Sequence, residues 1–351
     1  MAAKTISIGD RVVGEEHPTY IIAEMSANHL MSEERAYRII DAAKEVGADA
    51  VKIQTYTADT ITLDCDNEYF QITQGTIWDG TTLHRLYEEA YTPWDWQPRL
   101  KAYADKIGIA LFSSPFDRSA VDFLEELEVP AHKIASFEIT DIPLVRKVAK
   151  TGKPIIMSTG IAHLEDIERA VCACREEGND QVALLKCTSA YPAPYDSINL
   201  RTIPNIAETF GVVSGLSDHT MGHDVAVAGV AIGARIVEKH LTLARADGGP
   251  DAAFSMEPDE FKAMVDGIRI VEKALGTVTY ELSEKQIKSR EHSRSLFIAA
   301  DMKAGDVFTP DNVRSVRPAF GLHTMFYDEV MGRKAARDLA YGTPLSWDVI
   351  E

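Results

Sequence analysis

The sequence predicts a (β/α)8 barrel followed by a small β-rich domain, and three observations support this fold class. Short apolar runs recur along most of the chain, each ends in polar or ionisable residues, and segments with helical spacing fill most of the gaps. Tandem strand–helix units build such a barrel, whose catalytic groups come from the C-terminal ends of its strands. The eight runs are Tyr20–Glu24, Ala50–Thr55, Ala110–Pro115, His132–Ser136, Pro154–Thr159, Ala183–Ser189, Gly215–His219 and Arg235–His240. Their polar ends predict one active site assembled from distant segments.

The segments between the runs have the apolar spacing of amphipathic helices. This spacing is clearest in residues 34–47 and 119–130, ahead of the second and fourth runs. After the eighth run, residues 257–275 predict a final helix that begins with an acidic turn and ends at Gly276. Ahead of the first run, residues 1–19 predict a β-hairpin that closes the bottom of the barrel.

The chain has 351 residues, more than one ordinary barrel needs, which predicts a second domain. We assign residues 1–276 to the barrel and the polar stretch 277–290 to a linker. Residues 291–351 consist of short strand-like pieces and turns in which helical spacing is nearly absent. They predict a compact β-rich domain.

The composition is that of a globular protein, with 45% hydrophobic and 26% charged residues. No apolar run approaches the ~20 residues of a membrane span, and the N-terminus lacks the order of a signal peptide. The net charge of −18 disfavours nucleic acid and anionic membranes as partners. We therefore expect a cytoplasmic protein. Its four cysteines have no zinc-ligand spacing, and Cys187 is favoured as a buried structural thiol, although it ends a strand-like run and could line the site.

Two histidines end the last two predicted strands, in the pattern SDH-x18-EKH. Neighbouring strand ends can bring His219 and His240 to one divalent ion, and neutral imidazole suits Mn, Fe, Co or Zn. Two protein ligands leave positions open for water and substrate, as in a Lewis-acid catalyst. The alternative is a pair of packed core histidines. The flanking Asp218 and Glu238 favour the metal.

Lys52 and Lys133 lie inside otherwise apolar strands. Because an unpaired buried ammonium is costly, each lysine must escape burial, pair with an acid or face a bound anion. Lys186 stands at a third strand end. Ammonium and hydroxyl groups together form a cradle for phosphate or carboxylate, and the serines at strand ends are Ser113, Ser114, Ser136, Ser158 and Ser217. Schiff-base catalysis by one lysine is the competing interpretation.

Two carboxylates lie at strand ends: Glu24 ends the first run, and Glu138 lies two residues after the fourth. Either can act as a general base or bind a sugar hydroxyl or amide. A salt bridge to Lys52 or Lys133 is an equally good account and does not exclude the first. The long insertion at residues 57–96 would lie at the same face of the barrel, where it predicts a lid or specificity loop in preference to a purely structural excursion.

The motifs as a set resemble the sialic acid synthases over the whole barrel. They are AEMSANH, VKIQTYTADTITL, FSSPFD, HKIASFEI, KPIIMSTG, LLKCTSAYPAP, GLSDHT and EKHLT. The tail RSLFIAADMKAGDVFTPDNVRSVRP is similar to the antifreeze-like (SAF) C-terminal domain of that family. Within the family, the segments SANH, QTYTADT, GTIWDG, YEEAYTPWDW and LARADGGPDAAFSMEP look like the members that make pseudaminic acid.

The resemblance implies a transferase that condenses phosphoenolpyruvate (PEP) with 2,4-diacetamido-2,4,6-trideoxy-β-L-altropyranose and water. The products would be a nine-carbon acid and phosphate, released by C–O cleavage. The same chemistry on N-acetylmannosamine or on the legionaminate precursor is the nearest alternative. More distant alternatives are a Schiff-base aldolase and a non-catalytic glycan-binding or ice-binding protein, the last suggested only by the tail.

The resemblance also implies roles for individual residues. His219 and His240 would bind a divalent metal, Mn2+ in the first place and Mg2+ or Co2+ otherwise. PEP would be held by Lys52, Ser114, Lys133, Ser136, Ser158, Ser189 and Ser217. The sugar would be surrounded by Glu24, Gln54, Glu138, Tyr191, Glu238, Asp251 and Arg317. The catalytic set would be Glu24, Lys52, Lys133, Glu238 and Arg317.

Two further expectations follow from the resemblance. Arg317 looks like the arginine that the antifreeze-like domain inserts into the partner's site, which implies a domain-swapped homodimer. Ser189 stands where the neuraminate synthases have asparagine. Proton transfer falls to Glu24 or to a water on the metal, and Tyr56 and Trp78 are candidates to contact the C4 and C6 groups of the sugar.

Overall fold

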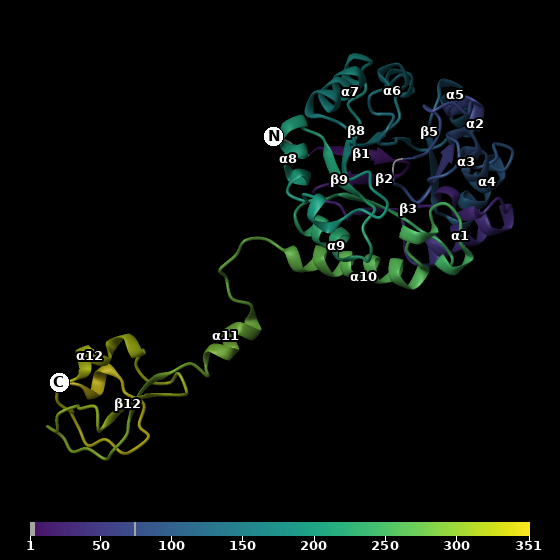
Figure 1. Cartoon of the computed structure of the whole chain (residues 1–351). Helices are drawn as coiled ribbons and strands as arrows, with labels where there is room; N and C mark the ends of the chain where they lie inside the picture. The colour runs from purple at the N-terminus through teal and green to yellow at the C-terminus, as the bar shows by residue number, and fades with distance from the viewer. Residues whose placement is uncertain (1–3, 74) are drawn as a thin grey trace. The chain divides into compact units, whose positions relative to one another are not determined.

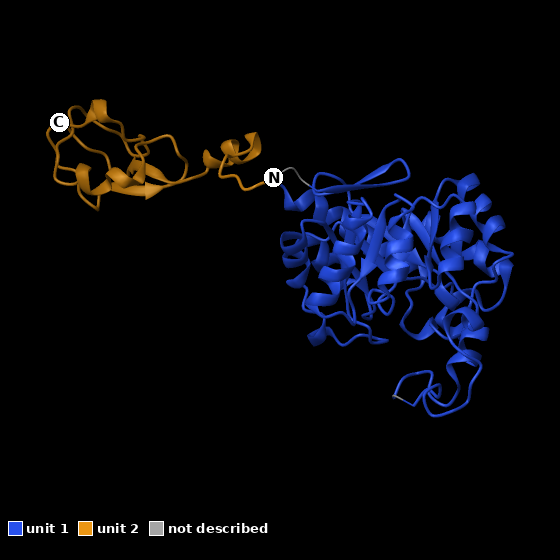
Figure 2. Cartoon of the chain, turned by 90° about the horizontal axis from the view of Figure 1, so that it is seen from above, with its two compact units in different colours: residues 1–276 blue, residues 277–351 orange. Residues whose placement is uncertain are grey.

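The computed structural model describes residues 4–73 and 75–351, which form two compact units. Unit 1 comprises residues 1–276 and unit 2 comprises residues 277–351 (Figure 2). Residues 1–3 of the predicted hairpin segment and Gln74 of the predicted insertion lie outside the described residues.

Unit 1 is a closed barrel of parallel strands in the order β10-β3-β4-β5-β6-β7-β8-β9, surrounded by helices (Figure 1). This confirms the predicted fold class. The strands are β3 (Tyr20–Glu24), β4 (Ala50–Thr55), β5 (Ala110–Pro115), β6 (His132–Ile134), β7 (Ile155–Ser158), β8 (Val182–Cys187), β9 (Val213–Asp218) and β10 (Ile236–His240). Each begins within three residues of the start of a predicted run, and β6 and β8 each end two residues before the predicted run does.

The helices follow from capping and amphipathic spacing. Ser32 caps α1 by accepting the Arg35 amide, and Asp117 caps α5 in the same way through Ser119 and Ala120. The long final helix ends at Gly276, as predicted. The helices around the barrel are α1 (Glu33–Glu45), α4 (Gln97–Ile107), α5 (Arg118–Glu126), α6 (Ile142–Ala149), α7 (Leu164–Glu176), α8 (Thr202–Phe210), α9 (Asp224–Ala231) and α10 (Pro258–Leu275).

The bottom of the barrel is closed by a hairpin of β1 (Thr5–Ile8) and β2 (Arg11–Gly14). Ile6, Ile8 and Val13 of this hairpin belong to the same buried cluster as Tyr20 and Phe112 of the barrel strands. Figure 2 shows the hairpin at one end of the barrel and the insertion after β4 projecting from the other. A ligand therefore reaches the interior from the side of the insertion.

The insertion after β4 contains α2 (Ala58–Ile61) and α3 (Leu83–Ala90), with a bridge between Gln71 and Thr82. Trp78 Nε1 donates to the carbonyl of Pro250, which lies after β10, at 3.0 Å. The insertion thus contacts the loop that follows β10, the last strand of the barrel. It lies at the end of the barrel opposite the hairpin.

Unit 2 is built around the antiparallel strands β11 (Ser295–Ile298) and β12 (Val313–Val316), with α12 (Tyr327–Val330). Its core includes Leu296, Phe308 and Leu345. The segment predicted as a linker contains a helix, α11 (Glu284–Arg290), because Ser283 and Gln286 form a capping box at its start. The 3-10 helices of the chain are Ser26–His29, Tyr195–Ser197, Arg245–Asp247, Ala252–Phe254, Thr324–Phe326 and Trp347–Val349. Across the described residues, none of the helices has the length and hydropathy needed to cross a membrane.

Candidate active site

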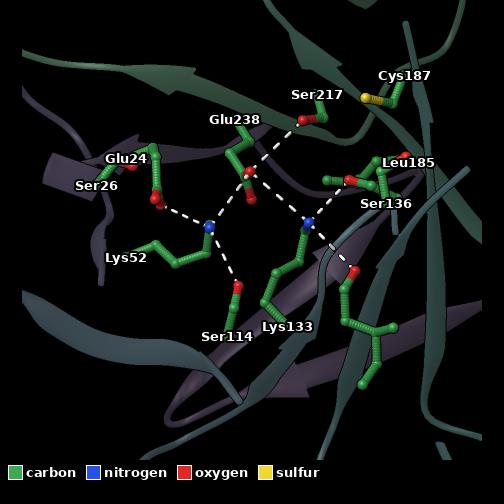
Figure 3. Close-up of polar contacts among 12 residues, drawn as sticks. Glu24, Ser26, Lys52, Ser114, Lys133, Ser136, Leu185, Cys187, Ser217 and Glu238 are labelled. Carbon is green, nitrogen blue, oxygen red and sulfur yellow. Dashed lines mark hydrogen bonds and ion pairs between the residues drawn. The ribbon is translucent and has the colours of Figure 1, made fainter. Parts of the chain in front are cut away.

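Lys52 lies at the centre of the barrel mouth among two carboxylates and a hydroxyl (Figure 3). Its Nζ lies 2.6 Å from Glu24 Oε2 of β3 and donates to Ser114 Oγ of β5 at 3.2 Å. The distance from Lys52 Nζ to Glu238 Oε1 of β10 is 3.6 Å. The four side chains come from neighbouring strands, so the barrel closure itself brings them together.

Lys133 of β6 approaches the same carboxylate oxygen from the other side. Its Nζ lies 3.7 Å from Glu238 Oε1 and donates to Ser158 Oγ of β7 at 2.8 Å. Ser217 Oγ of β9 also donates to Glu238 Oε1, at 3.5 Å. Among the described residues, the buried Glu238 Oε2 has no hydrogen-bond partner. One oxygen of Glu238 therefore joins the two lysines, and the other can accept a hydrogen bond from a ligand.

The charges of this cluster are set by burial and by each other. Burial alone would raise the pKa of Glu238, but the ammonium groups of Lys133 and Lys52 hold it below its usual value. Burial opposes the charge of Lys52, yet Glu238 and Glu24 hold the Lys52 pKa above its usual value. Burial lowers the pKa of Lys133 and raises that of Glu24. A bound anion would therefore stabilise the charged form of Lys133.

The serines that follow the next strands form a hydroxyl pair. Ser189 Oγ donates to Ser136 Oγ at 2.8 Å. Gly160 lies directly behind them, and a Cβ added there would come within 2.2 Å of Ser189 Oγ and 2.4 Å of Ser136 Oγ. Cys187 Sγ is buried 4.0 Å from Ser189 Oγ and 3.9 Å from His219 Nδ1, so this thiol both packs in the wall and lines the site.

The residues assigned to the sugar are linked by hydrogen bonds to the 3-10 helix that follows β3. Gln54 Nε2 donates to both Glu24 Oε1 and Ser26 Oγ at 2.9 Å. The buried Asp251 accepts the amide of Ala27 at 3.3 Å, and burial raises the pKa of its carboxyl group. This side therefore offers the acceptors and donors that hydroxyl and acetamido groups require.

His219 and His240 lie side by side, with ring centroids 5.4 Å apart. His219 Nδ1 lies 3.1 Å from the carbonyl of Thr188, and a carbonyl can only accept, so this contact requires a proton on Nδ1. His240 Nδ1 is buried without a hydrogen-bond partner among the described residues. Burial lowers the His240 pKa well below its usual value, which keeps this imidazole neutral.

These two imidazoles fit the predicted metal. A metal-binding histidine is neutral, and its second nitrogen donates to a carbonyl or carboxylate, as in His219. Among the residues that the structure describes, no group of three or more histidines, cysteines and carboxylates surrounds an ion position. An ion held here would therefore take its remaining ligands from water or substrate.

Aromatic rings surround the histidine pair. The Tyr191 ring lies 4.5 Å from that of His219 and 5.5 Å from that of Trp78 in the insertion. The Phe254 ring lies 4.9 Å from that of His240 and 5.1 Å from that of Tyr191. The rings provide an apolar wall beside the polar groups, which suits a ligand with methyl substituents.

Two residues depart from the expected cradle. Lys186 Nζ donates to the carbonyl of Cys187 at 2.7 Å, and its side chain lines a cavity of about 610 Å3 with Ile167 of α7 and Ile206 of α8. Ser113 Oγ bonds Thr55 Oγ1 at 2.6 Å and the carbonyl of Ile53. Successive side chains point to opposite faces of a strand, and both residues occupy positions that face the helices.

Other residues were missed by the sequence analysis or lie elsewhere. Ser26, Gly160 and Phe254 contact the site residues but were not predicted as site residues, although all three lie within the motifs that carry the family resemblance. Arg317 is exposed on unit 2 and forms no ion pair within the described residues. Tyr56 is buried against Phe116 and Tyr87.

Glu138, after β6, has a carboxyl oxygen, Oε2, that is buried without a hydrogen-bond partner among the described residues. Burial raises the pKa of this group to about 7. The group therefore titrates near neutral pH, within the electrostatic field of Lys133. The charge of Glu138 therefore changes with pH in the neutral range.

Glu138→Gln is expected to stabilise the ligand-free protein by about 3 kcal/mol at pH 8 but by less than about 1 kcal/mol at pH 5. The folded protein holds a proton on Glu138 that the unfolded chain releases near pH 4.5, so stability falls as pH rises from there to about 7. Urea unfolding at both pH values measures the difference. Glu126→Gln, on the exposed end of α5, is the control, and an equal effect of Glu138→Gln at both pH values would contradict the expectation.

Comparisons with known proteins agree with the resemblance found in the sequence. A model of the NeuB family matches residues 39–280, and a model of the SAF domain matches residues 293–351. A pseudaminic acid synthase of Campylobacter jejuni is 47% identical over 326 residues, which cover 93% of this chain and 95% of that protein. A pseudaminic acid synthase of Helicobacter pylori is 43% identical over 95% of this chain and 98% of its own. The crystal structure of the spore coat polysaccharide biosynthesis protein spsE of Bacillus subtilis superposes with a TM-score of 0.68 at 33% identity, covering 99% of each chain.

Proposed function

Because the chain belongs to the NeuB family, we propose that it is a PEP-dependent synthase that makes pseudaminic acid. C3 of PEP forms a bond to the aldehyde carbon of the open-chain 2,4-diacetamido-2,4,6-trideoxy-altrose. Water adds to C2, and the C–O bond to phosphate breaks. The observation that carries this proposal is the pair of buried ammonium groups, on Lys52 and Lys133, that share one oxygen of Glu238.

The two lysines bind the negative charges of PEP. The phosphate and the carboxylate each require a donor group, and Lys52 and Lys133 are held in place before the ligand arrives, which avoids reorganisation during the reaction. Ser114 and Ser158 accept hydrogen bonds from the two ammonium groups, and Ser217 bonds Glu238. The hydroxyl pair of Ser136 and Ser189 completes the proposed set of donors. This arrangement orients C3 of PEP toward the sugar side of the mouth.

Glu24 is the group we assign to proton transfer. Burial raises its pKa, which suits a carboxylate that takes a proton from the attacking water and returns it to the sugar oxygen that was the aldehyde. Gln54 holds one oxygen of Glu24 and Lys52 the other. The aldehyde end of the sugar would then lie between Glu24 and the histidine pair, with Glu138 and Asp251 binding its hydroxyl and amide groups.

His219 and His240 would hold a divalent ion, for which Mn2+ is the first candidate and Mg2+ or Co2+ the alternatives. Such an ion, when bound, would supply a Lewis acid for the sugar aldehyde. The aromatic wall of Tyr191, Phe254 and Trp78 would contact the methyl groups of the sugar. This contact favours a 6-deoxy diacetamido sugar over the more polar N-acetylmannosamine.

Phosphate release with PEP, Mn2+ and one sugar at a time tests the substrate. The diacetamido-trideoxy-altrose is expected to give the highest kcat/KM, ahead of the legionaminate precursor and N-acetylmannosamine. Faster turnover of either alternative would replace the pseudaminate assignment while leaving the synthase chemistry intact. Borohydride trapping of a lysine adduct that survives metal removal would instead support a Schiff-base aldolase.

We further propose that the protein is a domain-swapped homodimer in which Arg317 reaches the partner's site. Mixing Arg317→Ala and His240→Ala subunits is then expected to restore about a quarter of wild-type activity, because half of the dimers are mixed and each has one complete site. Each variant alone would be nearly inactive. No recovery, in a mixture whose subunit exchange is verified by mass spectrometry of tagged chains, would show that Arg317 does not act across subunits.

A further inference from the structure

Each of the two proposed metal ligands directly follows one member of a buried ion pair. Asp218 precedes His219 at the end of β9, and Lys239 precedes His240 at the end of β10. Lys239 Nζ lies 2.6 Å from Asp218 Oδ2, and both side chains have 0% exposure. An ion pair inaccessible to solvent therefore lies one residue before both histidines.

This pair is separate from the substrate cluster. The preceding residues, Ser217 and Glu238, face the barrel interior and bond each other. Because side chains alternate along a strand, Asp218 and Lys239 face the outer side of the barrel wall. The pair is thus not available to PEP or the sugar, and it needs another explanation.

The hydrogen bonds of the pair extend to the turn that contains His219. Lys239 Nζ donates to the carbonyl of Thr220 at 2.7 Å, and the Thr220 amide donates to Asp218 Oδ1 at 3.0 Å. Lys239 thus contacts both Asp218 and Thr220, the residues on either side of His219. Its ammonium group reaches the side chain of Asp218 before His219 and the backbone carbonyl of Thr220 after it.

The backbone pairing of the two strands ends at the same place. Lys239 and Asp218 are the last register partners of β10 and β9, after Val237 with Leu216 and Glu238 with Ser217. Beyond them, no ladder between these strands fixes the histidines relative to each other. The charged hydrogen bonds continue the connection where the ladder stops, and such bonds are short and strongly oriented.

We propose that Asp218 and Lys239 are positioning residues that hold His219 and His240 at the separation one shared divalent ion requires. The inference rests on the proposed metal site. It explains why a costly buried ion pair lies at this point of the barrel wall, where it touches no substrate. Its consequence is that metal affinity depends on two residues that are not ligands.

Mn2+ titration of the double variant Asp218→Asn/Lys239→Met, followed by the electron paramagnetic resonance signal of free Mn2+, tests the proposal on the full chain. Removing both charges together avoids leaving one of them buried alone. We expect Mn2+ to bind about 10- to 100-fold more weakly, as is typical when the groups that orient metal ligands are lost. PEP binding measured without metal is expected to stay at the wild-type value.

Asp49→Asn is the matched control. Asp49 accepts Arg11 at 2.8 Å and the Ile21 amide at 2.8 Å, far along the barrel from the histidines. It should lower thermal stability and leave Mn2+ affinity unchanged. If the control weakens Mn2+ binding as much as the double variant does, or if the double variant binds Mn2+ within about twofold of wild type, the positioning role is wrong.

Two further variants keep the outcome decisive. His240→Ala must abolish Mn2+ binding; if it does not, the proposed metal site itself fails, whatever the double variant does. Lys239→Gln serves if the double variant does not fold, because its amide can still donate to Thr220 or Asp218. A Mn2+ affinity of Lys239→Gln that lies between the wild-type affinity and the affinity expected for the double variant supports the proposal. A wild-type Mn2+ affinity of Lys239→Gln overturns it.

Discussion

His240→Ala is expected to reduce kcat/KM by about 10³-fold, because loss of a Lewis acid removes several kcal/mol of transition-state stabilisation. The fold should survive, since His240 Nδ1 makes no hydrogen bond among the described residues and the ring packs mainly against Phe254 and His219. His219→Ala should behave in the same way. Phosphate release at saturating Mn2+ and the Mn2+-induced shift in Tm are the measurements.

The matched control for the histidine pair is His223→Ala. His223 lies in the loop after β9 with a partly exposed side chain, and its Nε2 is 3.7 Å from the exposed Asp224. Activity and the Mn2+ response should remain at the wild-type level. An active His240→Ala variant, or one that retains the Mn2+-induced shift in Tm, would contradict the metal assignment.

Lys133→Met is expected to lower kcat/KM for PEP by about 10²- to 10³-fold, the usual effect of removing one preorganised charged donor. Methionine has nearly the length of lysine, and Glu238 keeps Lys52 at 3.6 Å, so no buried carboxylate is left without a cation. The loss should appear as a higher KM for PEP together with a lower kcat. Circular dichroism and thermal unfolding check the fold.

Lys186→Met is the control for Lys133→Met, because it removes an ammonium group from a barrel strand without touching the site. Lys186 lies on β8 and faces the cavity beside α7 and α8. Wild-type kinetics are expected. Equal losses in the two variants would mean that PEP does not bind to the cluster around Glu238.

The sequence predicted the barrel because each strand is a short apolar run that ends in polar residues. It could not predict which face of a strand a residue occupies when both faces are buried. In β8, Leu184 packs among the helices and Leu185 inside the barrel, so both faces are apolar and nothing in the pattern indicates the direction of Lys186. In β4, Ala50 and Lys52 face the interior while Val51 and Ile53 face the helices, again without a signal in the sequence.

The sequence predicted those parts of the candidate site whose function depends on the residue type at the end of a strand. Lys52, Lys133 and Glu238 are ionisable groups in apolar runs, and the structure brings them together. Gly160 and Phe254 were missed because their roles depend on which residues approach from other loops. The pairing of Asp218 with Lys239 was equally hidden, since it depends on the register between β9 and β10.

The carboxylates around the two lysines act as counter-ions that belong to the chain itself. Glu238 and Glu24 balance the charges of Lys52 and Lys133 before any ligand arrives. A singly charged anion such as acetate gains little by competing with carboxylates that are tethered to the chain. A ligand with several negative charges on two groups can replace them at both lysines together. We therefore expect the cluster to prefer an anion with charges on two groups to a singly charged one, in a chain whose overall charge of −18 repels anions.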